Sequence, residues 1–422
     1  LIYTEAEREV RHQLERKWRQ HEILVANMTK IIKEYGLSRS SMAAELARSI
    51  GVERDEASGE GWTIANNDCV DETARMQASS VGLILTSIPF STQYEYSPSY
   101  NDFGHTDDSE HFFRQMDFLT PELLRVLIPG RIMAIHVKDR ISPGGLTGMG
   151  FQTVQPFHAD CIYHYRRHGF AYLGMKTIVT DVVRENAQTY RLGWTEQCKD
   201  GSRMGVGMPE YLLLFRKPPT DSSNGYADVP VVKSKEKYSR ARWQFDAHGF
   251  ERSNGDRLLM PEDLKGLSAG QIFKAFKKHS LSSRAYDFEH DVALAEYLDK
   301  ARMLPPSFML LQPQSKSDDV WTDITRMRTL NCLQEAKGKE MHLCPMQFDT
   351  ADRAIVQYTN EGDEVYDPFG GLMTVPLRAV MLGRRGRGVE LNHRYYEDGV
   401  WYMQNADAKR QAPTLFDLTE DA

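Results

Sequence analysis

Paired cysteines, long apolar runs and an overall surplus of positive charge are all missing from this sequence. Its five cysteines are scattered, and no two of them form a Cys-x-x-Cys pair. An odd, unpaired set indicates neither a disulfide framework nor a zinc knuckle and is typical of reduced cytoplasmic thiols. No apolar run reaches the roughly 18 residues of a membrane span, and the charged stretch 5–19 is unlike a signal peptide. We therefore expect a cytoplasmic protein without a membrane partner.

Charge is unevenly distributed along the chain. The net charge of −7 gives no overall support to a polyanionic partner. Between residues 231 and 284, however, 12 Lys and Arg stand against six Asp and Glu. This stretch is therefore where a negatively charged partner would bind, although a solvated surface has the same composition.

The order of apolar segments predicts an α/β protein with additions. Residues 4–50 have helical spacing, and 53–61 form a polar spacer. Apolar runs typical of strands then occur at 81–85 and 132–137, with a helix at 111–127 and a turn at Pro129-Gly130 between them. Further strand candidates are 175–180 and 210–215, and sheet-type sequence resumes at 363–367 and 386–390. This alternation favours a largely parallel sheet. We divide the chain into a helical arm (1–60), two α/β halves (61–216 and 318–405), an inserted lobe (217–317) and an acidic tail (406–422).

The first candidate functional loop is Thr86-Ser87-Ile88-Pro89-Phe90. It ends a buried strand, which is where an open α/β sheet binds its ligands. Taken alone, these residues also fit an ordinary strand-to-loop turn.

The second candidate loop is Asp367-Pro368-Phe369-Gly370-Gly371. Its glycines allow the backbone to approach a ligand closely, and the helix that follows offers N–H groups. The next strand ends at Glu390, which is suited to accept hydrogen bonds from ribose hydroxyls. The spacing differs from G-x-G-x-x-G and so argues against a nicotinamide or flavin enzyme. Alone, this loop fits any nucleotide-binding unit.

Together, the two loops resemble the signatures of the amino-group DNA methyltransferases, a (D/N/S)-P-P-(Y/F/W) catalytic loop and a D-P-F-x-G-(S/T)-G cofactor loop. The catalytic loop comes first, as in the permuted β group, and the resemblance covers about 62–216 and 318–405. It implies a Rossmann-like methyltransferase sheet with helices on both faces. It also implies S-adenosylmethionine as cofactor and double-stranded DNA as partner, in a nucleoid-associated enzyme that methylates a base flipped out of the duplex.

Three features depart from the family pattern. Ile88 replaces the first proline of the catalytic loop, and Ser87 rather than Asp opens it. Leu372 and Met373 stand where the family has Ser or Thr and then Gly. A 5-methylcytosine enzyme needs a nucleophilic cysteine, usually in a Pro-Cys pair, and the sequence has none.

The resemblance assigns roles residue by residue. In catalysis, Ser87 Oγ and the Ile88 carbonyl would accept hydrogen bonds from the target amino group. Pro89 would fix the loop, and Phe90 would stack on the flipped base. The residues expected to bind the cofactor are Asp68, Thr86, Gln347, Asp367, Pro368, Phe369, Gly370, Gly371, Glu390 and Asn392. His342 fits either a structural role or a cofactor contact.

Two regions are expected to contact DNA. The aromatic loop 91–109 would act as a gate over the flipped base, and the basic lobe would read the target sequence. The residues expected to bind DNA are Tyr94, Tyr96, Arg166, Arg240, Arg242, Trp243, Lys274 and Lys277. We expect no metal, and a homodimer formed through the helical arm, whose apolar stripe must pack on something.

The target base stays open at this point. Ser87 leans toward cytosine N4 by the family's usual pattern, whereas the extended architecture resembles solitary bacterial and prophage adenine enzymes. Adenine N6 is slightly favoured. The other interpretations are a DNA-binding regulator with a disabled methyltransferase core, which the departures permit, and an RNA or protein methyltransferase. No nuclease motif is apparent, which favours a solitary enzyme over part of a fused restriction system.

Overall fold

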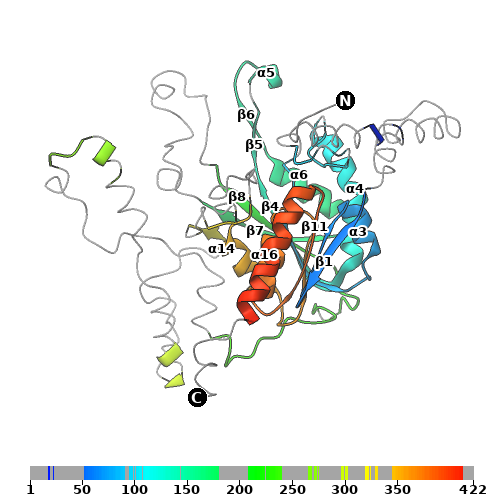
Figure 1. Cartoon of the computed structure of the whole chain (residues 1–422), viewed down its shortest axis with the longest axis vertical. Coiled ribbons are helices and arrows are strands. Elements are labelled where there is room, and N and C mark those ends of the chain that lie inside the picture. Colours follow the sequence, from blue (N-terminus) through cyan, green and yellow to red (C-terminus); the bar gives the residue numbers. More distant parts are fainter. Residues whose placement is uncertain are drawn as a thin grey trace, which may run out of the picture.

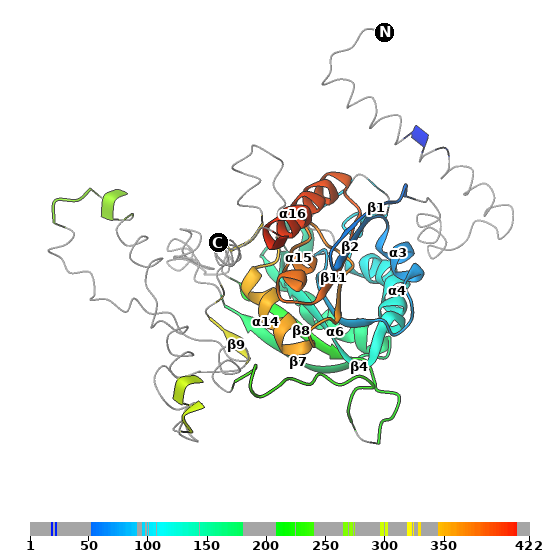
Figure 2. The same cartoon turned by 60° about the horizontal axis from the view of Figure 1, so that its bottom comes forward.

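The computed structural model describes residues 52–90, 101–106, 108–142, 144–179, 208–223, 225–239 and 345–411, with short stretches within 18–22, 95–99, 265–274, 296–302 and 319–330. These residues form an α/β fold around one large twisted sheet (Figures 1 and 2). Most of the N-terminal arm, the centre of the inserted lobe and the tail lie outside the described residues.

The strands are β1 (Asp55–Gly59), β2 (Trp62–Asn66), β3 (Val81–Ser87), β4 (Leu127–Lys138), β5 (Arg140–Ser142), β6 (Thr153–Gln155), β7 (Ala171–Ile178), β8 (Glu210–Arg216), β9 (Val320–Trp321), β10 (Glu364–Asp367) and β11 (Arg385–Glu390). The helices are α3 (Cys69–Arg75), α4 (Ser109–Val126), α5 (Gly144–Thr147), α6 (Phe157–Arg167), α14 (Phe348–Tyr358), α15 (Thr374–Met381) and α16 (His393–Gln411). The six strands expected from the sequence all form, within about five residues of the predicted limits.

The sheet has the strand order β1-β2-β11-β10-β3-β4-β8-β7-β9. Its central strands β2, β11, β10, β3 and β4 are parallel, while β8 runs antiparallel to β4 and β7. The carboxyl ends of the five parallel strands therefore meet at one edge. Ligands of open α/β sheets bind at this edge.

Helices cover both faces of the sheet, as expected for a Rossmann-like fold. Alternate strand residues point to opposite faces. Met133 and Ile135 of β4 belong to a core with α3, α4 and α6, whereas Ala134 belongs to a core with α14 and α15. A third apolar cluster joins β2, α15 and α16.

Two sequence expectations about local structure are wrong. The polar spacer 53–61 contains strand β1, which pairs with β2 because an edge strand can be polar. The Pro129-Gly130 turn lies inside β4. Gly130 has a φ of +83°, and its Cα faces the backbone of Ala227 so closely that a Cβ would lie 2.2 Å from Ala227 Cα. The chain thus kinks within the strand rather than reversing.

The start of the inserted lobe lies against the sheet domain. Lys217 N donates to Arg131 O at 3.1 Å, and Val232 N donates to the side chain of Asn360 at 2.8 Å. In Figure 2 this green segment runs along the base of the sheet. The division into five parts stays a prediction. None of the helices within the described residues is both long and apolar enough to cross a bilayer.

Candidate active site

Both sequence-predicted loops line one pocket at the carboxyl edge of the sheet. Ser87-Ile88-Pro89-Phe90 after β3 forms one wall, and Asp367-Pro368-Phe369-Gly370-Gly371 after β10 forms another. Counted out to its open mouth, the pocket encloses about 870 Å³. Loops 277 residues apart in the chain (Phe90 to Asp367) therefore meet across one pocket.

The loop after β10 is held by backbone and carboxylate hydrogen bonds. Gly370 N donates to Val389 O at 2.7 Å, and Asp367 Oδ1 accepts from Phe369 N at 3.0 Å. Glu390, at the end of β11, accepts from Gly371 N at 2.8 Å and from Asn392 N at 2.7 Å. These bonds bring Glu390 and Asp367 to adjacent positions on the same wall.

Leu372 and Met373 are absorbed into the core. Met373 is fully buried and adopts the left-handed conformation, with φ 65° and ψ 37°, at the position where the family has glycine. A Cβ added to Gly370 or to Gly388 would lie only 2.6 Å from the Met373 sulfur. Leu372 lines the pocket floor without closing it. The two departures in the cofactor loop are therefore accommodated by packing.

Burial raises the pKa values of three acidic side chains in the pocket. It raises the pKa of Asp367 to about 7, against the opposing effects of the Thr86 hydroxyl and the Phe369 amide. Burial also raises the pKa of Glu390 to about 7, with a smaller contribution from the charges of Asp102 and Asp367. The pKa of Asp102 is raised for the same reason. A positively charged ligand would favour the ionised forms.

Ser87 belongs to a chain of polar contacts that runs across three strands. Its Oγ lies 3.1 Å from Nδ1 of His136 on β4, and His136 Nε2 lies 3.0 Å from Oε2 of Glu210 on β8. A carboxylate accepts only, so Nε2 carries the proton of a neutral ring and Nδ1 accepts from the serine hydroxyl. The remaining lone pairs of Ser87 Oγ are thereby left for an incoming donor.

Residues of the segment after the catalytic loop also line the pocket. Asp102 accepts hydrogen bonds from the backbone of Tyr96, Ser97 and Gly104, the first and third at 2.7 and 2.8 Å. Phe103 packs edge-on against Phe369 at a centroid distance of 5.2 Å. This segment thus joins the two predicted loops.

Asn101, in the same segment, has a buried polar side chain without a hydrogen-bond partner among the described residues. Asn101 is 3% exposed and lines the pocket, and neither its amide nitrogen nor its amide oxygen has a hydrogen-bond partner among the described residues. Buried polar atoms are nearly always paired. A polar ligand in the pocket would supply the missing partners.

Arg140 anchors the end of the catalytic loop. Its Nη1 donates to the carbonyl of Phe90 at 3.1 Å, and its Nη2 donates to Ser109 Oγ at 2.7 Å. The guanidinium therefore links the loop to the first turn of α4, and it lies over the ring of Phe157.

Most of the sequence-predicted cofactor residues line the pocket, and three do not. Asp68 lines it and caps α3 by accepting from Val70 N at 2.7 Å. Thr86 is fully buried behind Asp367. Gln347 lies behind the catalytic wall and donates to Glu210 at 3.2 Å. Asn392 binds the carbonyl of Tyr96 at 2.6 Å.

The predicted DNA contacts are only partly described. Tyr96 lines the pocket, and Lys274 is exposed on a short helical turn. Arg166 is exposed near the end of α6, which leads into the start of β7, at the sheet edge opposite the pocket. The other predicted DNA contacts lie outside the described residues: Tyr94, Arg240, Arg242, Trp243 and Lys277. His342 also lies outside them.

Sequence reasoning missed His136, Glu210, Asn101, Asp102 and Arg140. The available signal for the first two was a polar residue in an otherwise apolar strand, Ile135-His136-Val137 and Glu210 before Tyr211. Their partnership depends on the register of β4 with β8, which the sequence does not display.

Comparison with known proteins agrees with this geometry. A family model described as DNA methylase, that of the N6 and N4 methyltransferases, matches residues 81–400. The chain belongs to this family. The class predicted from the two loops, an S-adenosylmethionine-dependent amino-methyltransferase, is the class of this family, while assignment to its permuted group stays a prediction.

Individual relatives match over shorter stretches. Type II methyltransferase M.BamHI of Bacillus amyloliquefaciens is 39% identical over 75 residues, 18% of this chain and 16% of that protein. Type II methyltransferase M.MthZI of Methanothermobacter thermautotrophicus is 37% identical over 78 residues, 18% of this chain and 21% of that protein. The matched part thus spans about a fifth or less of either relative.

Solved structures resemble the chain more broadly and more distantly. PvuII DNA methyltransferase, described as cytosine-N4-specific, is 12% identical and covers 82% of this chain and 90% of its own, with a TM-score of 0.47. A DNA modification methylase of Thermus thermophilus, in complex with S-adenosyl-L-methionine, is 20% identical and covers 80% and 93%, with a TM-score of 0.43.

Proposed function

We propose that this protein transfers a methyl group from S-adenosylmethionine to the exocyclic amino group of a base in double-stranded DNA. The observation that carries the proposal is the meeting of the Ser87 and Asp367 loops across one pocket. A nitrogen acceptor is supported by the serine at the catalytic position and by the lack of a Pro-Cys nucleophile in the sequence.

The residues of the pocket fit S-adenosylmethionine. Glu390 would hold the ribose hydroxyls, and Asp367 and Gly370 would face the methionine end. Carboxyls at this wall suit a cationic ligand, and the unpaired amide of Asn101 suits a polar one. When bound, the cofactor supplies an electrophilic methyl group on a sulfonium centre.

Ser87 would act as a hydrogen-bond acceptor for the target amino group. The lone pair of an exocyclic amine is delocalised into its ring, so the nitrogen is a poor nucleophile. An acceptor on each N–H draws the nitrogen toward tetrahedral geometry, and the Ile88 carbonyl would be the second acceptor. Because the Ser87 hydroxyl donates its hydrogen bond to His136 Nδ1, the lone pairs of its oxygen are left to accept. Catalysis would rest on positioning and electrostatics.

Base flipping and the identity of the base are part of the same proposal. An amino group inside the duplex cannot reach a buried pocket, so the base must leave the stack, and Phe90 would pack on it. We retain adenine N6 as the target. Cytosine N4 is the second candidate, because a serine at position 87 with its own histidine partner suits the family's serine-type motif.

The partners follow from the same reasoning. The basic stretch 231–284 would hold the duplex, and loop 91–109 would close over the flipped base, with Tyr94 and Tyr96 at the gate. We also propose a homodimer formed through the helical arm and an association with the nucleoid. A monomeric mass in solution that survives addition of DNA would contradict the dimer.

Mass spectrometry of nucleosides tests the base. DNA from a methylation-free host that expresses the full chain is digested and compared with DNA from the same host expressing Ser87→Ala. N6-methyladenine that depends on Ser87 supports the proposal. N4-methylcytosine in its place would replace adenine by the second candidate, and the absence of both would contradict amino methylation.

A further inference from the structure

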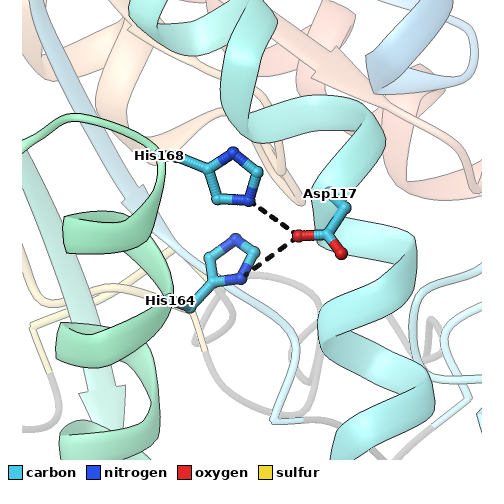
Figure 3. Close-up of side chains that lie close together, drawn as sticks. All are labelled: Asp117, His164 and His168. Carbon is cyan, nitrogen blue, oxygen red and sulfur yellow. Dashed lines mark hydrogen bonds and ion pairs between the residues drawn. The ribbon is translucent and has the colours of Figure 1, made fainter.

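Three potential metal ligands converge between α4 and α6, outside the pocket. Asp117 extends from α4, His164 from α6, and His168 is the residue at which α6 ends (Figure 3). Their nearest ligand atoms all lie within 4.8 Å of one another. None of the three lines the pocket, so this cluster is separate from the proposed active site.

His164 presents a bare nitrogen to the centre of the cluster. The Thr120 hydroxyl lies 2.8 Å from Met116 O and 2.8 Å from His164 Nε2. When the hydroxyl donates to the carbonyl, it accepts from Nε2–H, and Nδ1 of the neutral ring is then unprotonated. The side chain is 2% exposed, Nδ1 has no hydrogen-bond partner among the described residues, and it lies 3.7 Å from Asp117 Oδ1.

The cluster is thus short of a positive charge at its centre. In this tautomer, the lone pair of His164 Nδ1 faces a carboxylate oxygen of Asp117 at 3.7 Å, with no hydrogen bond between them. Figure 3 shows both rings directed at the same carboxylate oxygen.

Asp117 already attracts two donors. His168 Nε2 lies 2.7 Å from its Oδ1, and Arg167 Nη2 lies 2.6 Å from the same atom. The Arg167 side chain is 63% exposed and can move into solvent, while the carboxylate keeps a second oxygen for it. Arg167 therefore competes with any cation at this position without blocking it.

We propose that Asp117, His164 and His168 bind one divalent transition-metal ion, with Zn²⁺ the best match, that fastens α4 to α6. Two imidazoles and a carboxylate are a common zinc ligand set, and histidines four residues apart in a helix lie on one face. Zinc bonds of about 2.0–2.2 Å place tetrahedral ligand atoms roughly 3.3 Å apart. This separation lies between the distances from Asp117 Oδ1 to His168 Nε2, 2.7 Å, and to His164 Nδ1, 3.7 Å. Water would complete the set.

The hydrogen bonds around the cluster suit this role. Thr120 holds the second nitrogen of His164, as outer partners of metal-bound histidines do. On metal binding, His168 Nε2 must give up its proton, which moves to Nδ1 of the same ring or, from the cationic ring, to solvent. Since α4 starts shortly after the pocket-lining residues Asn101, Asp102 and Phe103, the ion would stabilise the helix that follows them.

Calorimetric titration of the chelator-treated full chain with Zn²⁺ alone tests the proposal. We expect one equivalent to bind and the midpoint of thermal unfolding to rise. His168→Ala and Asp117→Asn, both at partly exposed positions, should each weaken binding by more than about tenfold, the lower limit for loss of an outer partner. His158→Ala is the matched control, because His158 lies on the same helix and pairs with Asp139 at 2.7 Å.

Arg167→Gln gives a prediction of opposite sign. Removal of the competing cation should strengthen zinc binding, whereas in a purely structural ion pair it would only reduce stability. Thr120→Val, which keeps all three ligands, should weaken binding by about 10- to 100-fold. Equal zinc affinity of the unmodified chain and His168→Ala, or no binding by the unmodified chain, would overturn the proposal and leave a hydrogen-bonded ion pair.

Discussion

Ser87 Oγ lies 3.1 Å from His136 Nδ1, on the neighbouring parallel strand of the sheet. Behind the ring, Glu210 binds Nε2 at 3.0 Å and so determines which nitrogen carries the proton. The serine oxygen therefore faces the pocket with its own hydrogen directed away from it. This arrangement makes Ser87 an acceptor before any substrate arrives.

Glu210→Gln should lower kcat on the order of 10²-fold or more, because an amide can donate to Nε2 and reverse the ring tautomer. His136 would then donate to Ser87 and occupy the lone pair that the target amine needs. Cofactor affinity should not change. Steady-state kinetics and direct cofactor titration separate the two effects. Glu364→Gln is the matched control, because Glu364 pairs with Arg387 at the far end of β10. An unchanged kcat in Glu210→Gln would exclude this role for the tautomer.

The affinity for S-adenosylmethionine should increase as the pH rises from 6 through 7. Asp367 and Glu390 each have a pKa raised to about 7 by burial, so both are largely protonated in the free protein at pH 6. A cationic ligand and ribose donors favour the ionised carboxyls, and binding must therefore release protons. Calorimetry in buffers of different ionisation enthalpy measures that release near pH 6.5. Glu390→Gln should reduce it, and proton uptake would contradict the assignment.

Arg140→Met should lower kcat without a large change in cofactor affinity. The guanidinium binds the Phe90 carbonyl and Ser109 together, so its loss frees the end of the catalytic loop while the Asp367 loop keeps its own hydrogen bonds. Misplacement of a catalytic loop by about 1 Å can cost about 10²-fold in rate. Single-turnover methylation measures the effect, with Arg114→Met, at a partly exposed position of α4, as control. A loss confined to cofactor binding would show that Arg140 acts elsewhere.

Asn101→Ala should weaken cofactor binding and leave stability unchanged or raised. In the free protein the buried amide has no partner among the described residues, so its removal costs no hydrogen bond. The expected loss of affinity is about 5- to 30-fold, or roughly 1–2 kcal/mol. Asn360→Ala is the control. It should lower stability and leave cofactor binding unchanged, because Asn360 is hydrogen-bonded to Val232 and Pro230. A destabilised Asn101→Ala that binds the cofactor normally would refute the assignment.

Met373→Gly should destabilise the protein even though it restores the family's residue. Loss of the buried side chain costs about 2–5 kcal/mol, and relief of the left-handed conformation returns roughly 1 kcal/mol. The expected net loss is about 1–4 kcal/mol in the free energy of unfolding, measured with denaturant. Met381→Gly, at an exposed position of the same helix, should cost less. A gain in stability would show that packing does not offset the strain at Met373.

The sequence was sufficient to predict what is local. Strand β3 could be identified directly, because a compact apolar run marks a buried parallel strand. The loops that follow β3 and β10 could be identified from their motifs. β1 could not, because its exposed edge residues are polar, and Gly130 was mistaken for a turn because a Pro-Gly pair also occurs at a strand kink.

The second half of the site depends on contacts between distant segments. His136 meets Glu210 only through the antiparallel register of β4 and β8, 74 residues apart. Gln347, expected at the cofactor, is instead held by the same glutamate. The cluster of Asp117, His164 and His168 likewise forms only when α4 packs beside α6, and no spacing rule connects residue 117 to the pair on the other helix.

Methyl transfer to duplex DNA tests the central claim most directly. The full chain is incubated with S-adenosylmethionine carrying a labelled methyl group and with DNA of mixed sequence, alongside Ser87→Ala. The account predicts labelled DNA whose nucleosides carry the methyl group on an exocyclic nitrogen, and a large loss of label with Ser87→Ala. Label on carbon 5 of cytosine, or no label in any duplex DNA from a protein that binds the cofactor, would contradict it.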